Sequence, residues 1–237
     1  MTDRILYYGA SGRGAIGTIN ADNVLDTVLS LDSGTFASDW THITALSGNR
    51  ILYYAGESGR ACIGTIDDNN VLSDGPIFSA DDSPFGIGYR EVVTLSGDRV
   101  LFYSDIVGLS MLFRIPGQSP EFIRHYEAGA FATDWKQITG LSGDRVLFYG
   151  AGGRGCISTV DTENLFHDGP IFQEGTFAPD WKQITAFPDD RILYYGASGR
   201  GAIGTVSADN VLDTVLPLDN GTFAPDWIQV TSVRLPT

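Results

Sequence analysis

The string "RILYYGASGRGAIGT" occupies residues 4–18 and recurs, letter for letter, at residues 191–205. Three looser copies begin "RILYYAGESGR" at residue 50, "RVLFYSDIVGL" at residue 99 and "RVLFYGAGGR" at residue 145. The arginines that open the five copies are therefore spaced by 46, 49, 46 and 46 residues. Self-similarity at a period of 20–50 residues indicates a repeat architecture.

Each repeat has the pattern of four short β-strands. In the copy that starts at residue 135, "WKQITGL" is a first strand, "RVLFYG" a second, "GCISTV" a third and "LFHDGPIFQ" a fourth. Turns rich in Gly, Asp and Asn separate them, as expected of sheet strands. A four-stranded unit cannot bury both of its faces alone, so we expect the units to stack as the blades of a β-propeller.

The ends of the chain predict how the ring closes. The sequence starts at the second strand of a repeat and finishes with an isolated first strand, "WIQVTSV", at 227–233. Joined to the N-terminal three strands, that segment completes a fifth blade. We therefore predict an all-β, five-bladed β-propeller that forms a single domain over residues 1–237.

The chain resembles the five-bladed propeller lectins of the tachylectin-2 type, in its repeats of about 46 residues and in the aromatic residue that enters each first strand. The resemblance covers the whole chain in architecture, whereas the local motifs differ. It implies a sugar-binding protein with one site per blade or per blade junction.

Bulk composition excludes several classes of partner. The formal net charge is −14, which disfavours binding to nucleic acid or to an anionic membrane. No apolar run approaches the length of a membrane helix, and the N-terminus lacks the pattern of a secretory signal. We expect no membrane insertion, and a protein that is cytoplasmic or released by a non-classical route.

Two cysteines occur, Cys62 and Cys156, at the same position of two repeats, where other copies have Ala15 and Ala202. This position favours a small buried side chain over a disulfide or a metal ligand. We predict neither a metal nor a cofactor.

Strand directions place one set of repeated residues on one face. The glycine-rich turn between the second and third strands carries an arginine, and the loop before the first strand carries the pair Asp-Trp. Both lie at the same end of the blade. The candidate site residues are Arg13, Asp39, Trp40, Arg60, Asp134, Trp135, Arg154, Asp180, Trp181, Arg200, Asp226 and Trp227.

The copy whose second strand starts at Arg99 departs from this pattern. It has Tyr89 in place of Trp, Gly88 in place of Asp and Leu109 in place of Arg, while Arg99 and Phe85 are retained. Because the arginine, the aspartate and the tryptophan are lost together, we interpret them as one binding unit and the retained residues as scaffold. Neutral drift of this copy is the alternative.

The chemistry of the three residues suits a sugar. An aromatic ring accepts the C–H face of a pyranose, and Asp and Arg form charge-assisted hydrogen bonds with hydroxyl, acetamido or carboxylate oxygens. Glycines beside the arginine allow a ligand to approach the backbone. Several weak sites on one face would give avidity for a glycan surface. We therefore predict a multivalent lectin that agglutinates cells and recognises terminal sugars such as an N-acetylated hexosamine or a sialic acid.

Each of these residues also has a structural interpretation. The tryptophan could pack between blades, the aspartate could cap a turn, and the arginine could form a salt bridge. The sugar prediction requires open indole rings and free guanidinium groups. The arginines that open the second strands are expected to be structural, and His42, His125 and His167 to be surface residues.

Two other classes of function are the alternatives. A protein–protein interaction propeller without a glycan ligand is the main alternative, although its loops should vary more than these do. Catalysis needs unlike groups gathered in one pocket, and no nucleophile, metal or nucleotide motif is present. We therefore expect that the protein is not an enzyme.

Overall fold

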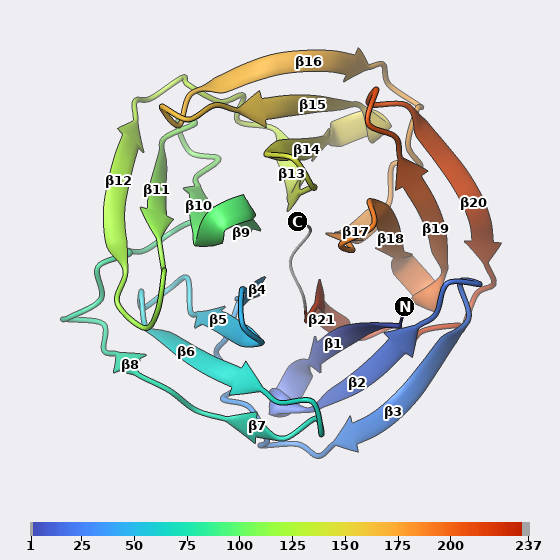
Figure 1. The fold of residues 1–237 in the computed structure, drawn as a ribbon, viewed down its shortest axis with the longest axis horizontal. Helices are drawn as coiled ribbons and strands as arrows, with labels where there is room; N and C mark the ends of the chain where they lie inside the picture. The colour runs from blue at the N-terminus through green and yellow to red at the C-terminus, as the bar shows by residue number, and fades with distance from the viewer. Residues whose placement is uncertain (1, 234–237) are drawn as a thin grey trace.

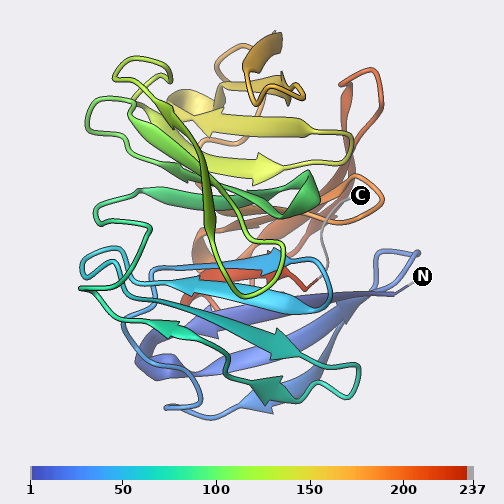
Figure 2. The ribbon, with the colours of Figure 1, turned by 60° about the vertical axis from the view of Figure 1, so that its left-hand side comes forward.

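The computed structural model describes residues 2–233, apart from the side chains of 214 and 215. Within this range the strands form five antiparallel sheets around a common axis, as predicted (Figure 1). The first strands of the five sheets line a central channel. Figure 2 shows the sheets from the side, stacked as the blades of a β-propeller. The predicted single domain over residues 1–237 extends beyond the described part at both ends.

Blade 1 contains both ends of the described chain. It pairs β21 (Trp227–Ser232) with β1 (Asp3–Gly9), followed by β2 (Gly14–Ile19) and β3 (Leu25–Leu31). The C-terminal strand thus closes the ring by hydrogen bonds to the N-terminal strand, in a register that places Tyr7 opposite Val230. The closure predicted from the ends of the sequence is confirmed.

The other blades follow in chain order, each with its first strand beside the channel. Blade 2 comprises β4 (His42–Leu46), β5 (Arg50–Tyr54), β6 (Ala61–Ile66) and two short outer strands, β7 (Leu72–Ser73) and β8 (Ile77–Phe78). Blade 3 comprises β9 (Glu91–Leu95), β10 (Arg99–Tyr103), β11 (Ser110–Arg114) and β12 (Glu121–Tyr126).

Blade 4 comprises β13 (Trp135–Gly140), β14 (Arg145–Gly150), β15 (Gly155–Val160) and β16 (Phe166–Phe172). Blade 5 comprises β17 (Trp181–Ala186), β18 (Arg191–Gly196), β19 (Gly201–Val206) and β20 (Leu212–Leu218). In blade 2 the predicted fourth strand is interrupted, so that β7 and β8 pair separately with β6.

The core lies between the blades because each sheet buries both faces against its neighbours. Leu193 and Tyr195 of blade 5, for example, pack against Ile5 and Tyr7 of blade 1. Cys62 and Cys156 are buried free thiols in these layers, which agrees with the interpretation as small core residues. No helix in residues 2–233 is long and apolar enough to cross a membrane.

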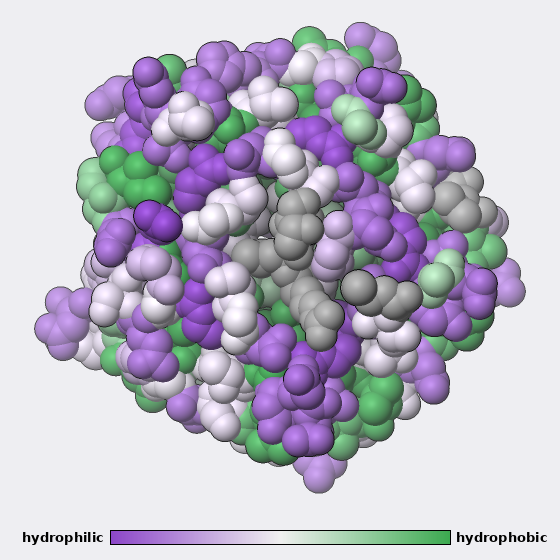
Figure 3. Space-filling view, in the orientation of Figure 1, coloured by the Kyte–Doolittle hydropathy of each residue, from purple (hydrophilic) through white to green (hydrophobic). Residues whose placement is uncertain are grey.

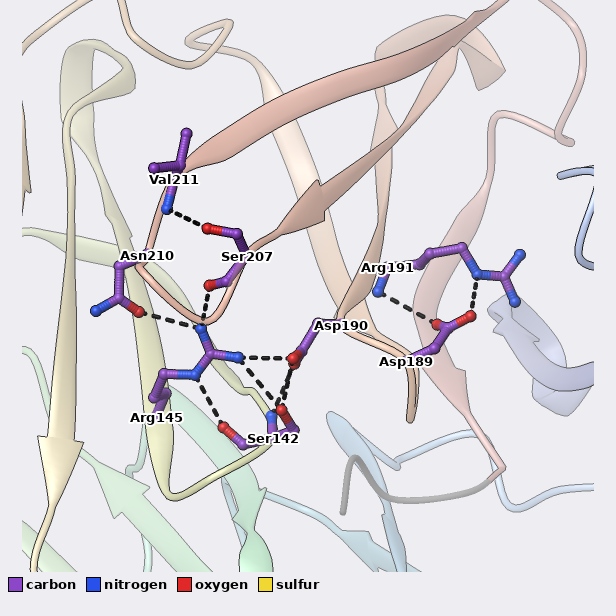
Figure 4. A network of polar contacts seen from close by, with 8 residues as sticks. All are labelled: Ser142, Arg145, Asp189, Asp190, Arg191, Ser207, Asn210 and Val211. Carbon is purple, nitrogen blue, oxygen red and sulfur yellow. Dashed lines mark hydrogen bonds and ion pairs between the residues drawn. The ribbon is translucent and has the colours of Figure 1, made fainter.

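The arginines that open the second strands join neighbouring blades (Figure 4). Arg145 of blade 4 donates to the Asp190 carboxylate at 2.7 Å, to the Ser207 carbonyl at 2.6 Å and to Asn210 Oδ1 at 3.1 Å. These acceptors all belong to blade 5. Arg191 makes the equivalent link from blade 5 to Asp3 of blade 1 at 2.7 Å. The predicted structural role of these arginines is confirmed.

A tyrosine latch occurs in every blade. The last tyrosine of each "R-[IV]-L-[FY]-Y" string donates its hydroxyl to a carbonyl of the loop that leads to the next blade. The pairs are Tyr8 with Ala37, Tyr54 with Gly86, Tyr103 with Ala132, Tyr149 with Ala178 and Tyr195 with Ala224, at 2.7–3.0 Å. Because blade 3 keeps the latch, the latch belongs to the scaffold.

Candidate functional site: four Arg-Asp-Trp clasps and an asymmetric pocket

The glycine-rich turn owes its sequence to the fold. The glycine before the arginine has a positive φ, for example +68° at Gly12 and +74° at Gly153. A Cβ at either position would lie 1.9 Å from the carbonyl oxygen of Phe36 or Phe177 in the following loop. The glycine was expected to let a ligand approach the backbone. Instead, a loop of the chain itself lies against the glycine. Blade 3 keeps this feature at Gly108, although it lacks the arginine.

The predicted Arg-Asp-Trp residues do converge, once in each of four blades. Each guanidinium carbon lies 4.1–4.5 Å from the centre of its tryptophan ring, and each guanidinium forms an ion pair with the aspartate that precedes the tryptophan. We call each set a clasp. The clasps are Arg13–Asp226–Trp227, Arg60–Asp39–Trp40, Arg154–Asp134–Trp135 and Arg200–Asp180–Trp181.

Local strand geometry creates the space for the indole. Trp135 pairs with Gly150 across a β-bulge in β13, and a Cβ on that glycine would lie 3.1 Å from the indole. A bulge can re-aim a side chain at the end of a strand. The ring of Phe148, 5.5 Å away, also packs against the indole. The tryptophan is thus held between the glycine, a second aromatic ring and the guanidinium.

The clasps differ from the open sites that the sugar prediction required. Trp40 and Trp135 are only 7% and 9% exposed, Trp181 and Trp227 are partly buried, and a guanidinium covers one face of each indole. The aspartates remain about half exposed, from 48% to 55% of the side chain. What these sets offer a ligand is therefore mainly carboxylate oxygens and guanidinium edges, because one face of each indole is already covered.

The clasp electrostatics have one dominant cause. The hydrogen bond from Arg154 lowers the pKa of the Asp134 carboxyl below its ordinary value, and the same bond raises the pKa of Arg154. Asp134 also accepts from Arg154 Nε at 3.2 Å, so the pair is bidentate.

A groove lies beside one clasp, between blades 5 and 1. It encloses about 710 Å³. Arg13 and Trp227 form one wall, Phe223 lies at the junction, and Ser30 and Asp32 at the end of β3 form the outer wall. This volume is in the range of ordinary small-molecule sites.

A second, asymmetric pocket of about 460 Å³ lies between blades 2 and 3, at the channel end of their first strands. It is lined by unlike groups. Glu57, Arg90, Glu91 and Asp105 belong to no repeated motif, and they lie together with Tyr89 and His42. Arg90 forms an ion pair with Asp105 at 3.2 Å. The positions of the two charges are exchanged relative to a clasp, because here the arginine precedes the first strand and the aspartate lies in the turn between the second and third strands.

His42 corrects a prediction. It was expected at the surface, but its Nε2 donates to the Arg90 carbonyl at 2.6 Å while Nδ1 contacts the Thr41 hydroxyl at 2.9 Å. Burial lowers the pKa of His42 to about 4. A departure from the repeat could have identified this residue: the third position of the first strand is glutamine in Gln137, Gln183 and Gln229, but histidine in blade 2 and glutamate in blade 3.

The first strands end at the face opposite the clasps, and Figure 3 shows that face. Hydrophilic residues surround its centre, and hydrophobic residues lie in separate groups toward the rim. The clasps and the pocket between blades 2 and 3 are on the other face.

Comparisons with known proteins support the fold. No protein-family model and no curated protein matches this chain. Among solved structures, a protein from Bacteroides uniformis described as a candidate 6-phosphogluconolactonase is 14% identical with a TM-score of 0.52, over 97% of this chain and 71% of that one. A protein solved in a nidogen/laminin complex is 8% identical with a TM-score of 0.52, over 93% and 80%. Virginiamycin B lyase from Staphylococcus aureus is 15% identical with a TM-score of 0.42, over 89% and 68%.

The two likenesses with TM-scores above 0.5 support a β-propeller fold and nothing finer; they do not support the tachylectin-2 resemblance. They also overturn the expectation that the protein is not an enzyme, because a propeller named for an enzyme activity shares its fold. That expectation was wrong in its premise as well. It assumed that unlike groups do not gather in one pocket, whereas the departures from the repeat meet between blades 2 and 3.

Proposed function

We propose that the protein is a multivalent carbohydrate-binding propeller whose sugars occupy grooves at blade junctions, beside the clasps. The groove between blades 5 and 1 is the observation that carries the proposal. The groove has a suitable volume, and hydroxyl, carboxylate, guanidinium and aromatic groups line it. Such a set can bind hydroxyl groups and also contact the apolar side of a sugar ring.

The role of the clasp in this proposal differs from the one inferred from sequence. The guanidinium is committed to the indole and to Asp226, so the clasp holds the edge of the groove in place. The exposed carboxylate oxygens of the aspartate are free to accept from sugar hydroxyls, since 55% of the Asp226 side chain is exposed. The repetition of the clasp in four blades supports several sites on one face.

A glycan array, followed by calorimetry with the best ligand, tests the proposal. The variant Ser30→Trp fills the groove without altering a clasp, because Ser30 is an exposed residue on its outer wall. We expect the stoichiometry to fall by one site per chain. Ser73→Trp, in the exposed outer strand β7, is the matched control and should leave binding unchanged. An array without signal at high protein concentration would refute the proposal.

A protein-interaction module is the second candidate, and one observation favours it. Blade 3 exposes Ile106 and Val107 in its turn, and Ile87 lies exposed in the loop before it. The regular repeats have Ala, Glu, Gly, Ser, Thr or Pro at these positions. Capture of a protein partner that is lost in Ile106→Ser but retained in Ser30→Trp, with no glycan signal, would favour this function.

A further inference from the structure

The side chains that line the pocket between blades 2 and 3 differ from those at the equivalent positions of the other blades. Glu57 stands where blades 1, 4 and 5 have Ala, and Arg90 where the other blades have Thr, Lys or Ile. Glu91 and His42 stand where blades 1, 4 and 5 have Gln, and Asp105 corresponds to Gly56 of blade 2. These residues of blades 2 and 3, up to 63 positions apart in the chain, line the pocket together with Gln229 of blade 1.

Acidic side chains outnumber basic ones in this pocket. Three carboxyl groups, Glu57, Glu91 and Asp105, line it, and Arg90 is its one guanidinium, already paired with Asp105. His42 adds no positive charge at neutral pH, because its Nε2 donates to a carbonyl and burial keeps its pKa near 4. The pocket thus has an excess of acidic groups with no matching cation on its own walls.

Glu91 forms no ion pair with the other described residues. Its carboxylate accepts one hydrogen bond, from Gln137 Nε2 at 3.1 Å, in the channel mouth. Burial raises the pKa of this carboxyl well above its ordinary value, Asp105 raises it further, and Arg90 opposes both. A ligand cation would favour the ionised form of this carboxyl, because a nearby positive charge lowers its pKa and a charge-assisted hydrogen bond is stronger than a neutral one.

Two exposed aliphatic side chains are chain neighbours of residues that line this pocket. Ile87 and Ile106 are 67% and 77% exposed, and they adjoin Gly88 and Asp105, which line the pocket. Ile87 reaches the turn of blade 2, where its Cγ2 atom would lie 3.0 Å from a Cβ on Gly59. Exposed aliphatic side chains beside a pocket are suited to an apolar part of a ligand.

We propose that this pocket is a single binding site for a small organic amine that carries an apolar group. The ammonium donates to Glu91 and neighbouring carboxylate oxygens, and the apolar group rests against Ile87 and Ile106. A metal ion does not fit the same residues, because no three His, Cys, Asp or Glu side chains within the described range 2–233 are placed to ligate one. The site is separate from the clasps and from the groove of the proposed function.

Calorimetry with benzylamine and benzyl alcohol tests the proposal, since the two probes differ only in the ammonium and hydroxyl groups. We expect benzylamine to bind once per chain and benzyl alcohol to bind at least about tenfold more weakly, the loss of one charge-assisted hydrogen bond. Glu91→Gln should weaken benzylamine by about tenfold as well. This variant restores the residue found in three other blades, so it should fold.

Two further variants complete the test. Glu57→Gln lies in an exposed turn and should weaken benzylamine by about twofold. Asp209→Asn removes an exposed carboxylate elsewhere and should have no effect. Equal binding of the two probes, full binding in Glu91→Gln, the same loss in Asp209→Asn, or no binding of benzylamine at millimolar concentration would each overturn the proposal.

Discussion

Replacing the arginine of one clasp by leucine, Arg154→Leu, reproduces in blade 4 the side chain that blade 3 has at Leu109. The guanidinium lies 4.3 Å from the Trp135 ring and pairs with the half-exposed Asp134. A partly exposed cation–π contact contributes about 1 kcal/mol, and an exposed ion pair about 0.5 kcal/mol. We expect the free energy of unfolding to fall by about 1.5 kcal/mol, which corresponds to a Tm lower by roughly 3–6 °C in a chain of this size.

Urea denaturation and thermal unfolding measure this change, with the exposed Arg114→Leu as the matched control. A loss above about 4 kcal/mol, or no loss, would refute the assignment of the clasp as a partly exposed stabilising contact. The pH dependence gives a second check. Because the pKa of Asp134 is lowered in the folded state, the ion pair stabilises the protein above the unfolded pKa of Asp and is lost as the pH falls through the folded pKa. The difference between wild type and Arg154→Leu should therefore shrink in acid.

Three other substitutions test the scaffold and the channel mouth. His42→Gln should make the protein less sensitive to acid. Because folding lowers the pKa of His42 from 6.5 to about 4, the unfolded state takes up a proton at a higher pH than the folded state does. Between pH 7 and pH 5 the free energy of unfolding of wild type should therefore fall by about 2 kcal/mol more than that of the variant. Equal pH profiles in urea denaturation would contradict this. Tyr149→Phe removes the 2.9 Å bond to the Ala178 carbonyl and should cost about 1–3 kcal/mol by the same assay; an unchanged midpoint would show that the latch does not stabilise the loop. Arg145→Met leaves the Asp190 carboxylate without its partner and should cost about 3–5 kcal/mol in chemical denaturation, whereas a loss below 1 kcal/mol would mean that the blade-to-blade link is dispensable.

Much of the fold could be predicted because it depends on local rules that repeat. The 46-residue spacing, the turns and the isolated first strand at the C-terminus were enough to predict five blades and their closure. The interpretation of Cys62 and Cys156 as core residues also held, since a position shared with alanine has room only for a small side chain. Topology alone placed the arginines of the turns beside the tryptophans of the first strands.

The candidate sites were only partly predictable. Sequence placed Arg154, Asp134 and Trp135 together, but it left open whether the guanidinium would bind a ligand or form a salt bridge, and it did not predict the contact with the indole. The orientation of the guanidinium depends on the rotamer of Arg154 and on the space above Gly150, and both are decided by packing in the folded protein. The pocket between blades 2 and 3 was missed because its residues depart from the repeat at different positions, so that none belongs to a motif.

By itself, the sequence determined the repeating unit, the number of blades and the way the ring closes, since strand period and turn chemistry are local properties of the chain. Tertiary structure decided which polar groups are already paired and which remain available. That outcome depends on contacts between distant segments, such as Arg90 with Asp105 and His42 with the Arg90 carbonyl. A repeat pattern specifies what every blade shares. The asymmetric pocket between blades 2 and 3 arises where neighbouring blades with different side chains pack together.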